Sequence, residues 1–203
     1  MANGPFLFVA LVGAYLLGSL PFGVLVGRLW AGVDIRDHGS GNIGFTNMLR
    51  VLGPLPGLLV LIGDVAKGAA GAYLGRTLTG SDLAALLAAV ASVAGHNWSI
   101  FLRFRGGRGV NTTAGAFGYL APQPILAAFT VWALVVILTR YVSLASIIAA
   151  LTAPIFMWVF GYPYPYVAFM LLAAVFIVFR HRANIKRLLQ GTESKIGQRV
   201  KIK

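Results

Sequence analysis

The chain has 203 residues, of which 58% are hydrophobic and only 11% are charged, and this leaves too little polar surface to cover a soluble domain of that length. Seventeen lysines and arginines against five acidic residues give a formal net charge of +12, but there is no basic helix or aromatic-rich sheet outside the apolar segments to bind nucleic acid. The expected partners are therefore membrane lipid and an anionic substrate, and the lack of cysteine excludes disulfides and thiol catalysis.

The chain divides into apolar segments of about the length that crosses a membrane, which is roughly 20 helical residues for a core about 30 Å thick. The first, Pro5 to Gly27, is uncharged and has no basic stretch before it, which favours a first transmembrane helix over a cleaved signal peptide. The second runs from Val51 to Leu74 and contains Asp64 and Lys67. The third runs from Asp82 to Phe101.

Two longer uncharged segments follow, over residues 109–139 and 141–179. Each is too long for a single crossing. Pro122 and Pro124 indicate a break in the first, and the motif 161-GYPYPY-166 suits an interfacial turn in the second. The helices expected on this basis are Thr113–Leu120, Ile125–Thr139, Ser143–Phe160 and Val167–Phe179.

The distribution of basic residues predicts the orientation. With the N-terminus outside, the cytoplasmic segments contain 15 of the 17 lysines and arginines, and only Lys67 and Arg76 fall elsewhere. By the positive-inside rule we expect an all-α membrane protein with seven transmembrane helices, an outside N-terminus and a cytoplasmic C-terminus. Two loops rich in glycine and arginine, 36–50 and 103–113, then face the cytoplasm, and residues 1–203 form one domain.

The first loop contains 39-GSGNIGFTN-47, which combines glycines with short polar side chains. Such a stretch can turn several backbone N–H groups towards an oxyanion, and it is longer than a hairpin connection requires. The alternative is an ordinary turn between helices. The groups predicted to contact a substrate phosphate here are Ser40, Gly41, Asn42, Thr46, Asn47 and Arg50.

The second loop contains 105-RGGRG-109, which places two guanidinium groups around a pair of glycines. Guanidinium groups donate forked hydrogen bonds that match phosphate oxygens. Anchoring to lipid headgroups explains most arginines beside membranes, but anchors need no glycines. We therefore predict that the substrate phosphate is bound by Arg105, Gly106, Gly107 and Arg108.

Asp64 and Lys67 lie three residues apart within an apolar segment, so they share a helix face. Charges in that position are costly and usually face the bundle interior or a wet cavity. The pair either fixes the orientation of its helix or contacts the substrate, and Lys67 is expected to add positive field to the site. His96, at the inner end of the third segment, is expected to be a hydrogen-bonded interface residue.

The segment 180-RHRANIKR-187 spaces His181, Asn184 and Arg187 at three-residue steps along one helical face, and its histidine is a candidate proton acceptor. Ser143 and Ser146 begin the sixth apolar segment on the same side of the membrane. They either cap a helix or contact a ligand at its positive end, and we include both in the predicted site.

Several reaction signatures are missing from the chain. There is no H-x4-D dyad of the kind many acyl-CoA-dependent acyltransferases carry, no G-x-S-x-G elbow and no H-E-x-x-H pair. Neither loop offers a cluster of carboxylates, so we expect no metal and no cofactor. Any chemistry must rely mainly on electrostatic positioning.

Taken together, these residues resemble the bacterial acyl-phosphate:glycerol-3-phosphate acyltransferases, the PlsY family of integral membrane enzymes. The resemblance covers essentially the whole chain and rests on six segments in order. They are 18-GSLPFG-23, 39-GSGNIGFTN-47, 64-DVAKG-68, 95-GH-96 with 104-FRGGRGV-110, 141-YVSLAS-146 and 181-HRANIKRLLQGTE-193.

The resemblance implies a seven-helix enzyme of the bacterial inner membrane whose active site faces the cytoplasm. Such an enzyme transfers an acyl group from acyl phosphate to glycerol 3-phosphate and releases lysophosphatidic acid, the first committed phospholipid precursor. Carried over by position, the phosphate ligands are Ser40, Asn47, Arg50 and Arg108. The residues implied at the reacting centre are Ser146, His181 and Asn184, and Glu193 matches a family glutamate regarded as structural.

The chain departs from the family pattern at a few positions. Arg105 and Arg108 stand where lysines are common, and Phe45 and Asn111 stand where alanine is usual. Arginine keeps the charge and adds bidentate geometry, so we expect the activity to survive these changes. Phe45 could narrow the site.

The main alternative is a small transporter for an organic phosphate, because arginine-rich loops and an intramembrane ion pair also suit that function. Such a transporter is expected to have inverted halves, and the sequence shows no such symmetry. A structural membrane subunit would leave the two glycine-rich loops unexplained.

Overall fold

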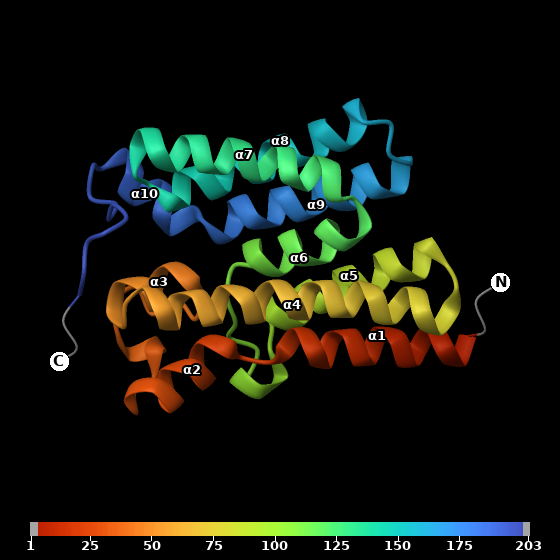
Figure 1. The fold of residues 1–203 in the computed structure, drawn as a ribbon, viewed down its shortest axis with the longest axis horizontal. Helices are drawn as coiled ribbons and strands as arrows, with labels where there is room; N and C mark the ends of the chain where they lie inside the picture. The colour runs from red at the N-terminus through yellow and green to blue at the C-terminus, as the bar shows by residue number, and fades with distance from the viewer. Residues whose placement is uncertain (1–3, 201–203) are drawn as a thin grey trace. The chain divides into compact units, whose positions relative to one another are not determined.

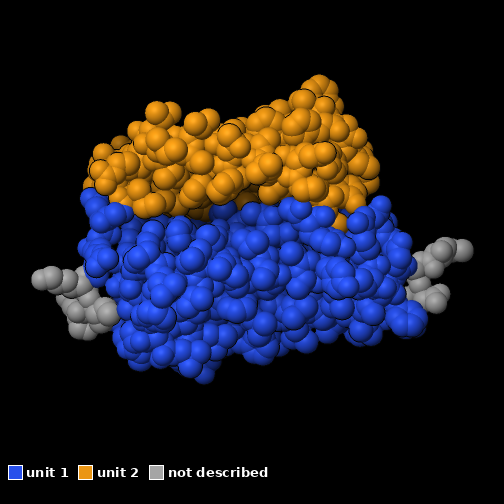
Figure 2. All heavy atoms as spheres, in the orientation of Figure 1, with its two compact units in different colours: residues 1–119, 197–203 blue, residues 120–196 orange. Residues whose placement is uncertain are grey.

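A computed structural model describes residues 4–200 of the chain. Within this range all regular secondary structure is helical, as predicted. The described residues divide into two compact units, one formed by residues 4–119 with 197–200 and the other by residues 120–196 (Figure 2). Lys201 and Lys203, which the charge count includes, lie outside the described residues. That the whole chain acts as one domain stays a prediction.

The first unit is built around three long apolar helices that pack on one another, α1 (Gly4–Ser19), α4 (Pro54–Thr79) and α5 (Asp82–Asn97) (Figure 1). Shorter helices complete it. They are α2 (Phe22–Ala31), the 3₁₀ helix η1 (Ile35–Asp37), α3 (Phe45–Val51), the 3₁₀ helix η2 (Ile100–Leu102) and α6 (Val110–Leu120).

The first predicted helix is interrupted in the structure. The sequence predicts one helix over Pro5–Gly27, whereas α1 ends at Ser19 and α2 begins at Phe22. Pro21 explains the break, because it lacks an N–H group and disfavours helical conformation in the residue before it. At the break, the carbonyl of Leu20 accepts hydrogen bonds from the N–H of Phe22 at 3.1 Å and from Lys67 Nζ at 2.8 Å.

Two helices of the second unit begin at or beside prolines that the sequence analysis places before them. We expected helices from Ile125 and from Val167, but α7 begins at Pro122 and α9 begins at Tyr164, directly before Pro165. Proline suits the first turn of a helix because its missing N–H would have no partner there. The predicted boundaries are therefore about three residues late at both positions.

Helices α4 and α6 approach so closely that there is no room for side chains where they cross. A β-carbon on Gly68 would collide with the carbonyl oxygen of Thr112, and a β-carbon on Gly115 would collide with the carbonyl oxygen of Val65. Small residues permit this kind of backbone contact between helices in membranes. The contact fixes the start of α6 and, with it, the end of the arginine-containing loop.

The second unit contains α7 (Pro122–Thr139), α8 (Val142–Val159), α9 (Tyr164–Arg180) and α10 (Arg182–Leu189). Helix α8 packs against both α7 and α9. The chain bends by 57° between α9 and α10, at His181. The start of α8, the short helix α10 and the segment after it form the polar end of this unit.

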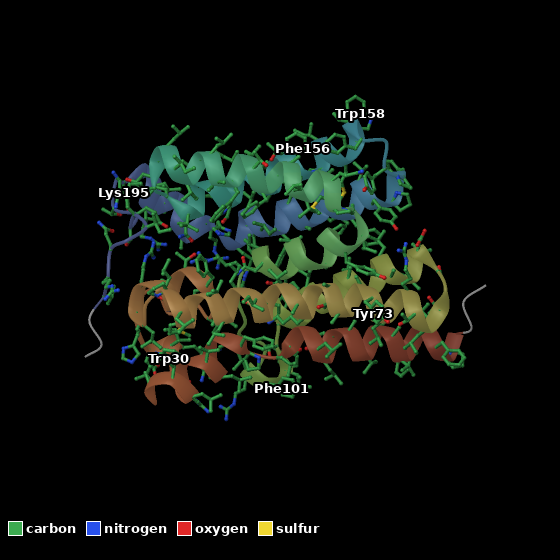
Figure 3. The ribbon with its side chains drawn as sticks, in the orientation of Figure 1. Trp30, Tyr73, Phe101, Phe156, Trp158 and Lys195 are labelled. Atoms are coloured by element: carbon green, nitrogen blue, oxygen red, sulfur yellow. The ribbon has the colours of Figure 1, made fainter. Side chains whose placement is uncertain are left out.

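Five helical segments among the described residues are long and apolar enough to cross a membrane, or up to six if the bent pair α9 and α10 forms one span. Helix α6 has 11 residues, fewer than a crossing requires, so seven transmembrane helices stay a prediction. Large apolar side chains face outwards, as lipid-facing residues do. Examples are Trp30, Tyr73, Phe101 and Trp158, which are 50–73% exposed (Figure 3).

Candidate functional site

The first glycine-rich loop is held from the inside by Asn47, which is buried near the start of α3. Its Oδ1 accepts a hydrogen bond from the N–H of Ser40 at 2.8 Å. Its Nδ2 donates to the carbonyls of Ile35 and His38 at 3.2 and 3.0 Å. Gly41 has a positive φ of 70°, which glycine adopts without strain. Asn47 therefore shapes the loop, and Ser40 and Gly41 are exposed on it.

A charged network lies just before this loop. Asp34 caps η1 by accepting the N–H of Arg36, and its carboxylate pairs with the Arg36 guanidinium through contacts of 2.9 and 2.6 Å. Arg28 on α2 adds a contact of 3.2 Å. The hydrogen bond from the Arg36 side chain holds the pKa of Asp34 well below its ordinary value, although partial burial opposes the shift. Asp34 thus stays ionised and ties α2 to η1.

The loop after η2 packs its backbone against the end of α5. The N–H groups of Gly106 and Gly107 donate to the carbonyls of Asn97 and His96, both at 3.1 Å. A β-carbon on either glycine would collide with His96, so the close approach requires glycine. The glycines thus have a packing role that the sequence does not predict, and Arg105 and Arg108 flank the packed pair.

Asp64, Lys67 and His96 form a buried polar cluster in the first unit. Lys67 Nζ lies 2.8 Å from Asp64 Oδ1, and His96 Nδ1 lies 3.4 Å from the same oxygen. The side chains of Asp64 and Lys67 are each 2% exposed. Lys67 also bonds to Leu20, as described above, and its own carbonyl accepts a hydrogen bond from Ser92 at 3.1 Å. These contacts support the interpretation that the pair fixes the helices. Substrate contact by Lys67 stays a prediction.

In the second unit, Glu193 gathers three hydrogen-bond donors. Ser143 Oγ and Asn184 Nδ2 both donate to Oε1 at 2.7 Å, and Arg187 Nε donates to Oε2 at 2.6 Å. Burial pushes the pKa of Glu193 upwards, but these hydrogen bonds outweigh it and hold the pKa below its ordinary value. As predicted, Asn184 and Arg187 share a face of α10. Glu193 therefore ties the start of α8 to α10.

Replacing Glu193 by glutamine is expected to destabilise the protein by about 1–2 kcal/mol, because the glutamine amide presents a donor to groups that are themselves donors. The melting temperature of the purified protein in detergent should fall by about 2–8 °C. Since the folded pKa is depressed, the carboxylate contributes stability above its ordinary pKa near 4.5 and loses it as the pH falls through the folded pKa.

The matched control for this variant is Asp37→Asn, which neutralises an exposed carboxylate in η1. It should melt within about 1 °C of the natural protein, since exposed substitutions have small effects. Melting curves between pH 3 and 7 should show that Glu193→Gln has lost the acid-dependent part of the stability. An unchanged melting temperature and an unchanged pH profile would contradict the structural role of Glu193.

His181 is buried at the junction of α9 and α10. Its Nδ1 lies 2.8 Å from the carbonyl oxygen of Ile177. A carbonyl oxygen only accepts hydrogen bonds, so in the neutral ring Nδ1 carries the proton and Nε2 is the acceptor. This tautomer suits the role of proton acceptor that the sequence predicts.

The other predicted site residues are distributed over both units. Ser146 is buried on α8, and its hydroxyl accepts a hydrogen bond from Trp132 Nε1 at 3.3 Å. Phe45 opens α3 and Asn111 lies in the first turn of α6, so these two departures from the family pattern sit at helix starts. The candidates that are half-buried in the first unit are Asn42, Thr46, Arg50 and Arg108.

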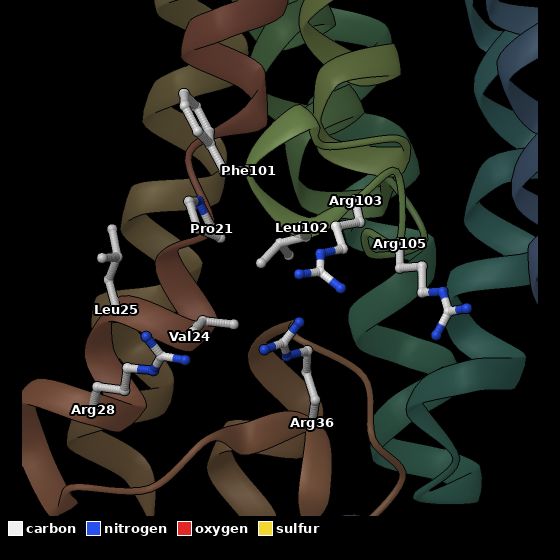
Figure 4. A pocket seen from close by; sticks show the side chains of 9 residues that line it. All are labelled: Pro21, Val24, Leu25, Arg28, Arg36, Phe101, Leu102, Arg103 and Arg105. Atoms are coloured by element: carbon white, nitrogen blue, oxygen red, sulfur yellow. The ribbon is translucent and has the colours of Figure 1, made fainter.

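The structure also brings together arginines that the sequence does not group. Arg28, Arg36 and Arg103 line one cavity of the first unit together with Arg105 (Figure 4). Arg36 and Arg103 begin the two glycine-rich loops but are not among the predicted phosphate ligands, and Arg28 enters the sequence analysis only through the orientation of the chain. No pattern within a single sequence pairs arginines that lie so far apart along the chain, so only the fold identifies this group.

Comparison with known proteins gives matches along nearly the whole chain. The family model described as glycerol-3-phosphate acyltransferase matches residues 8–191. A protein of that name from Desulforamulus reducens is 49% identical over 189 residues, which cover 93% of this chain and 94% of the relative. Glycerol-3-phosphate acyltransferase 2 from Moorella thermoacetica is 53% identical over 191 residues, which cover 94% and 98%.

Two solved structures have a closely similar fold. The crystal structure of PlsY (YgiH), an integral membrane glycerol 3-phosphate acyltransferase, in its glycerol 3-phosphate form has a TM-score of 0.89 and 40% identity, with 96% of each chain covered. The lysophosphatidic acid form has a TM-score of 0.87 and 39% identity, with 96% of this chain and 97% of that chain covered. The similarity therefore extends far beyond a shared motif.

Proposed function

The chain belongs to the glycerol-3-phosphate acyltransferase family and transfers an acyl group to glycerol 3-phosphate, and we propose that its donor is an acyl phosphate and its acceptor the 1-hydroxyl group. The observation that carries the proposal is the similarity to PlsY over 96% of the chain. The products are then 1-acylglycerol 3-phosphate, which is lysophosphatidic acid, and inorganic phosphate.

The proposed reaction is attack of the 1-hydroxyl oxygen on the acyl carbonyl carbon. A new ester C–O bond forms, the C–O bond to the phosphate breaks, and phosphate leaves with the bonding electrons. An acyl phosphate is a mixed anhydride with a good leaving group, so strong acid catalysis is not required. The protein has mainly to hold two phosphate-bearing molecules together despite their mutual repulsion, and orientation of this kind can supply up to about 7–11 kcal/mol.

We assign binding of the substrate phosphates to residues 40–50 of the first glycine-rich loop and residues 105–108 of the second. Arg50 and Arg108 supply the charge that offsets repulsion between the substrates, and Ser40 supplies a neutral donor. The exposed position of Ser40 and the three hydrogen bonds of Asn47 within the loop support a division of work in which Asn47 shapes the loop and Ser40 contacts the ligand.

The proton of the 1-hydroxyl group leaves either to His181 Nε2 or to a phosphate oxygen of a substrate. The hydrogen bond from Nδ1 to Ile177 supports the first route, because it leaves Nε2 as the acceptor nitrogen. Ser146 and Asn184 are proposed to line the reacting centre, and Ser143 to contact substrate. These assignments follow from the resemblance and from the polar network around Glu193.

We propose that the protein lies in the bacterial inner membrane with its N-terminus outside and its active site facing the cytoplasm. The concentration of lysines and arginines in the segments 28–50, 102–112, 140–142 and 180–203 supports this orientation. Membrane lipid is then a constant neighbour. The transporter alternative loses its support, since relatives that match 93% and 94% of the chain are named as acyltransferases.

The test is product formation by the purified, detergent-solubilised protein with glycerol 3-phosphate and either palmitoyl phosphate or palmitoyl-CoA. We expect lysophosphatidic acid and free phosphate from palmitoyl phosphate alone. Product from the CoA donor alone would retain acyl transfer and contradict the proposed donor. No product from either donor, in protein shown to be folded, would contradict the activity itself.

A further inference from the structure

The first unit contains a cavity of about 570 Å³ with four arginines in its wall, Arg28, Arg36, Arg103 and Arg105. They come from three different parts of the chain: α2, η1 and the turn after η2. The guanidinium groups of Arg28, Arg36 and Arg103 point into the space between them (Figure 4). The fold therefore gathers positive charge at one place, although like charges repel and would otherwise separate.

Two carboxylates offset only part of this charge. Asp34 pairs with Arg28 and Arg36. Asp37 attracts Arg36 from the next position in η1, so the four arginines and two aspartates retain two positive charges. The side chains of Arg103 and Arg105 form no hydrogen bond or ion pair among the residues that the structure describes. Arg103 is also held in the left-handed region at φ 52°, a conformation that non-glycine residues rarely adopt. The cavity thus has guanidinium groups available for an anion.

The size of the charge indicates the class of anion. A phosphate monoester carries between about −1.5 and −2 charges at neutral pH, and its oxygens match the forked donors of several guanidinium groups. A carboxylate would offset less of the charge and use fewer donors. Two positive charges in one cavity therefore fit a phosphate monoester best.

The rest of the cavity wall is apolar. Leu25 and Phe101 line it and are 43% and 56% exposed, and Leu29 and Trp30 continue the apolar surface along α2 with exposures of 88% and 50%. Exposed apolar side chains of this kind, on a protein with membrane-spanning helices, face acyl chains or the lipid interface. A ligand with a phosphate head and an acyl tail could contact the arginines with its phosphate and the apolar side chains with its acyl chain.

We propose that this cavity is a second phosphate site, separate from the acyl-transfer chemistry, that binds a phosphate monoester. The ligand comes either from a lipid such as phosphatidic acid or from a soluble phosphate, and the apolar wall favours the lipid. Arg28, Arg36 and Arg103 are assigned to this site alone. Arg105 also lies in the loop predicted to bind substrate, so the test leaves it unchanged.

The test uses the full chain in nanodiscs of phosphatidylcholine that contain a photoactivatable phosphatidic acid. After irradiation, mass spectrometry of the digested protein measures labelling of residues 20–36 and 98–105. The test variant is Arg28→Gln/Arg103→Gln, which keeps the pairing of Arg36 with Asp34. The matched control is Arg182→Gln/Arg199→Gln, which removes two exposed arginines elsewhere. The readout is labelling, so it is independent of the proposed function.

We expect labelling of the cavity segments in the natural protein and in the control, and a loss of about 10-fold or more in the test variant, since two charge-assisted contacts are removed. Turnover by both double variants should stay within about two-fold of the natural protein, which reports that they are folded. If unlabelled phosphatidic acid reduces the labelling and inorganic phosphate does not, the ligand is a lipid. If millimolar inorganic phosphate reduces the labelling equally, the ligand is a soluble phosphate. Labelling that is unaffected by the variant, or equal labelling by a photoactivatable phosphatidylcholine, would overturn the proposal.

Discussion

Replacing Arg108 by glutamine is expected to lower kcat/KM for acyl transfer by about 10²–10³-fold, and the same loss is expected for Arg50→Gln. The physical reason is that the reaction brings two phosphate groups together, so the charge that offsets their repulsion must already be in place. Removal of one preorganised donor from a site of this kind typically costs about 2.7–4 kcal/mol of transition-state stabilisation. Steady-state kinetics with palmitoyl phosphate and glycerol 3-phosphate measure the effect.

Two controls separate this role from a general effect of charge. Arg182→Gln removes an exposed arginine at the start of α10 and should change kcat/KM by less than about two-fold. Arg108→Lys should retain most of the activity, because the resemblance places lysine at this position in many family members. If Arg108→Gln kept kcat/KM within a few-fold of the natural protein, Arg108 would not be a phosphate ligand.

Loss of His181 should matter less than loss of either arginine. The leaving group is already good, and a substrate phosphate oxygen can accept the proton, so His181→Ala is expected to cost no more than about 10²-fold, the low end of the range for a positioned proton acceptor. Nearly full turnover by His181→Ala would remove the histidine from the mechanism and leave the substrate phosphate as the base. A loss larger than that of Arg108→Gln would show that proton transfer limits the reaction.

Replacing Lys67 by methionine is expected to destabilise the protein by about 3–5 kcal/mol, because it removes the lysine that pairs with the buried Asp64 carboxylate at 2.8 Å and leaves that charge only partly offset. For a chain of this length the melting temperature in detergent should fall by about 6–20 °C. The variant also removes the hydrogen bond from Lys67 to the Leu20 carbonyl, so the break between α1 and α2 loses one of its supports at the same time.

The double variant Asp64→Asn/Lys67→Met provides the control. It removes both charges, so it should recover part of the lost stability, and the two substitutions should be strongly non-additive because the side chains are in contact. The KM for glycerol 3-phosphate, measured on the folded fraction, should stay close to the natural value if the pair is structural. A stable Lys67→Met protein with a greatly raised KM would instead place Lys67 at the substrate.

Composition and local pattern were enough to predict much of the fold. An excess of apolar residues requires a membrane or a partner surface, and the segment lengths match a bilayer. The ends of α7 and α8 lie within one residue of their predicted positions. Helix ends of this kind are predictable because proline, glycine and charged residues affect the backbone only of the few residues next to them. The sequence predicts the starts of α7 and α9 about three residues too late, since proline indicates a break in a helix but also suits the first turn of one.

The candidate site was predictable to the extent that its chemistry lies in contiguous segments. The loops 39–47 and 105–109 and the spacing of Asn184 and Arg187 are visible without coordinates, as is the shared helix face of Asp64 and Lys67. What each polar group contacts was not visible, because the partners are distant in the chain. Examples are the bond from Lys67 to Leu20 and the bond from Ser143 to Glu193.

The sequence by itself thus determined that this protein is a helical membrane protein and predicted that two of its loops bind an anion, since both conclusions follow from composition and from residues close together in the chain. Only the tertiary structure decided that Gly106 and Gly107 serve to pack their loop on His96 and that Arg28 and Arg103 share a cavity. The physical reason is that such contacts depend on where helices cross and chains turn back. A backbone collision or a repulsion between two guanidinium groups exists only after the fold has brought the groups together.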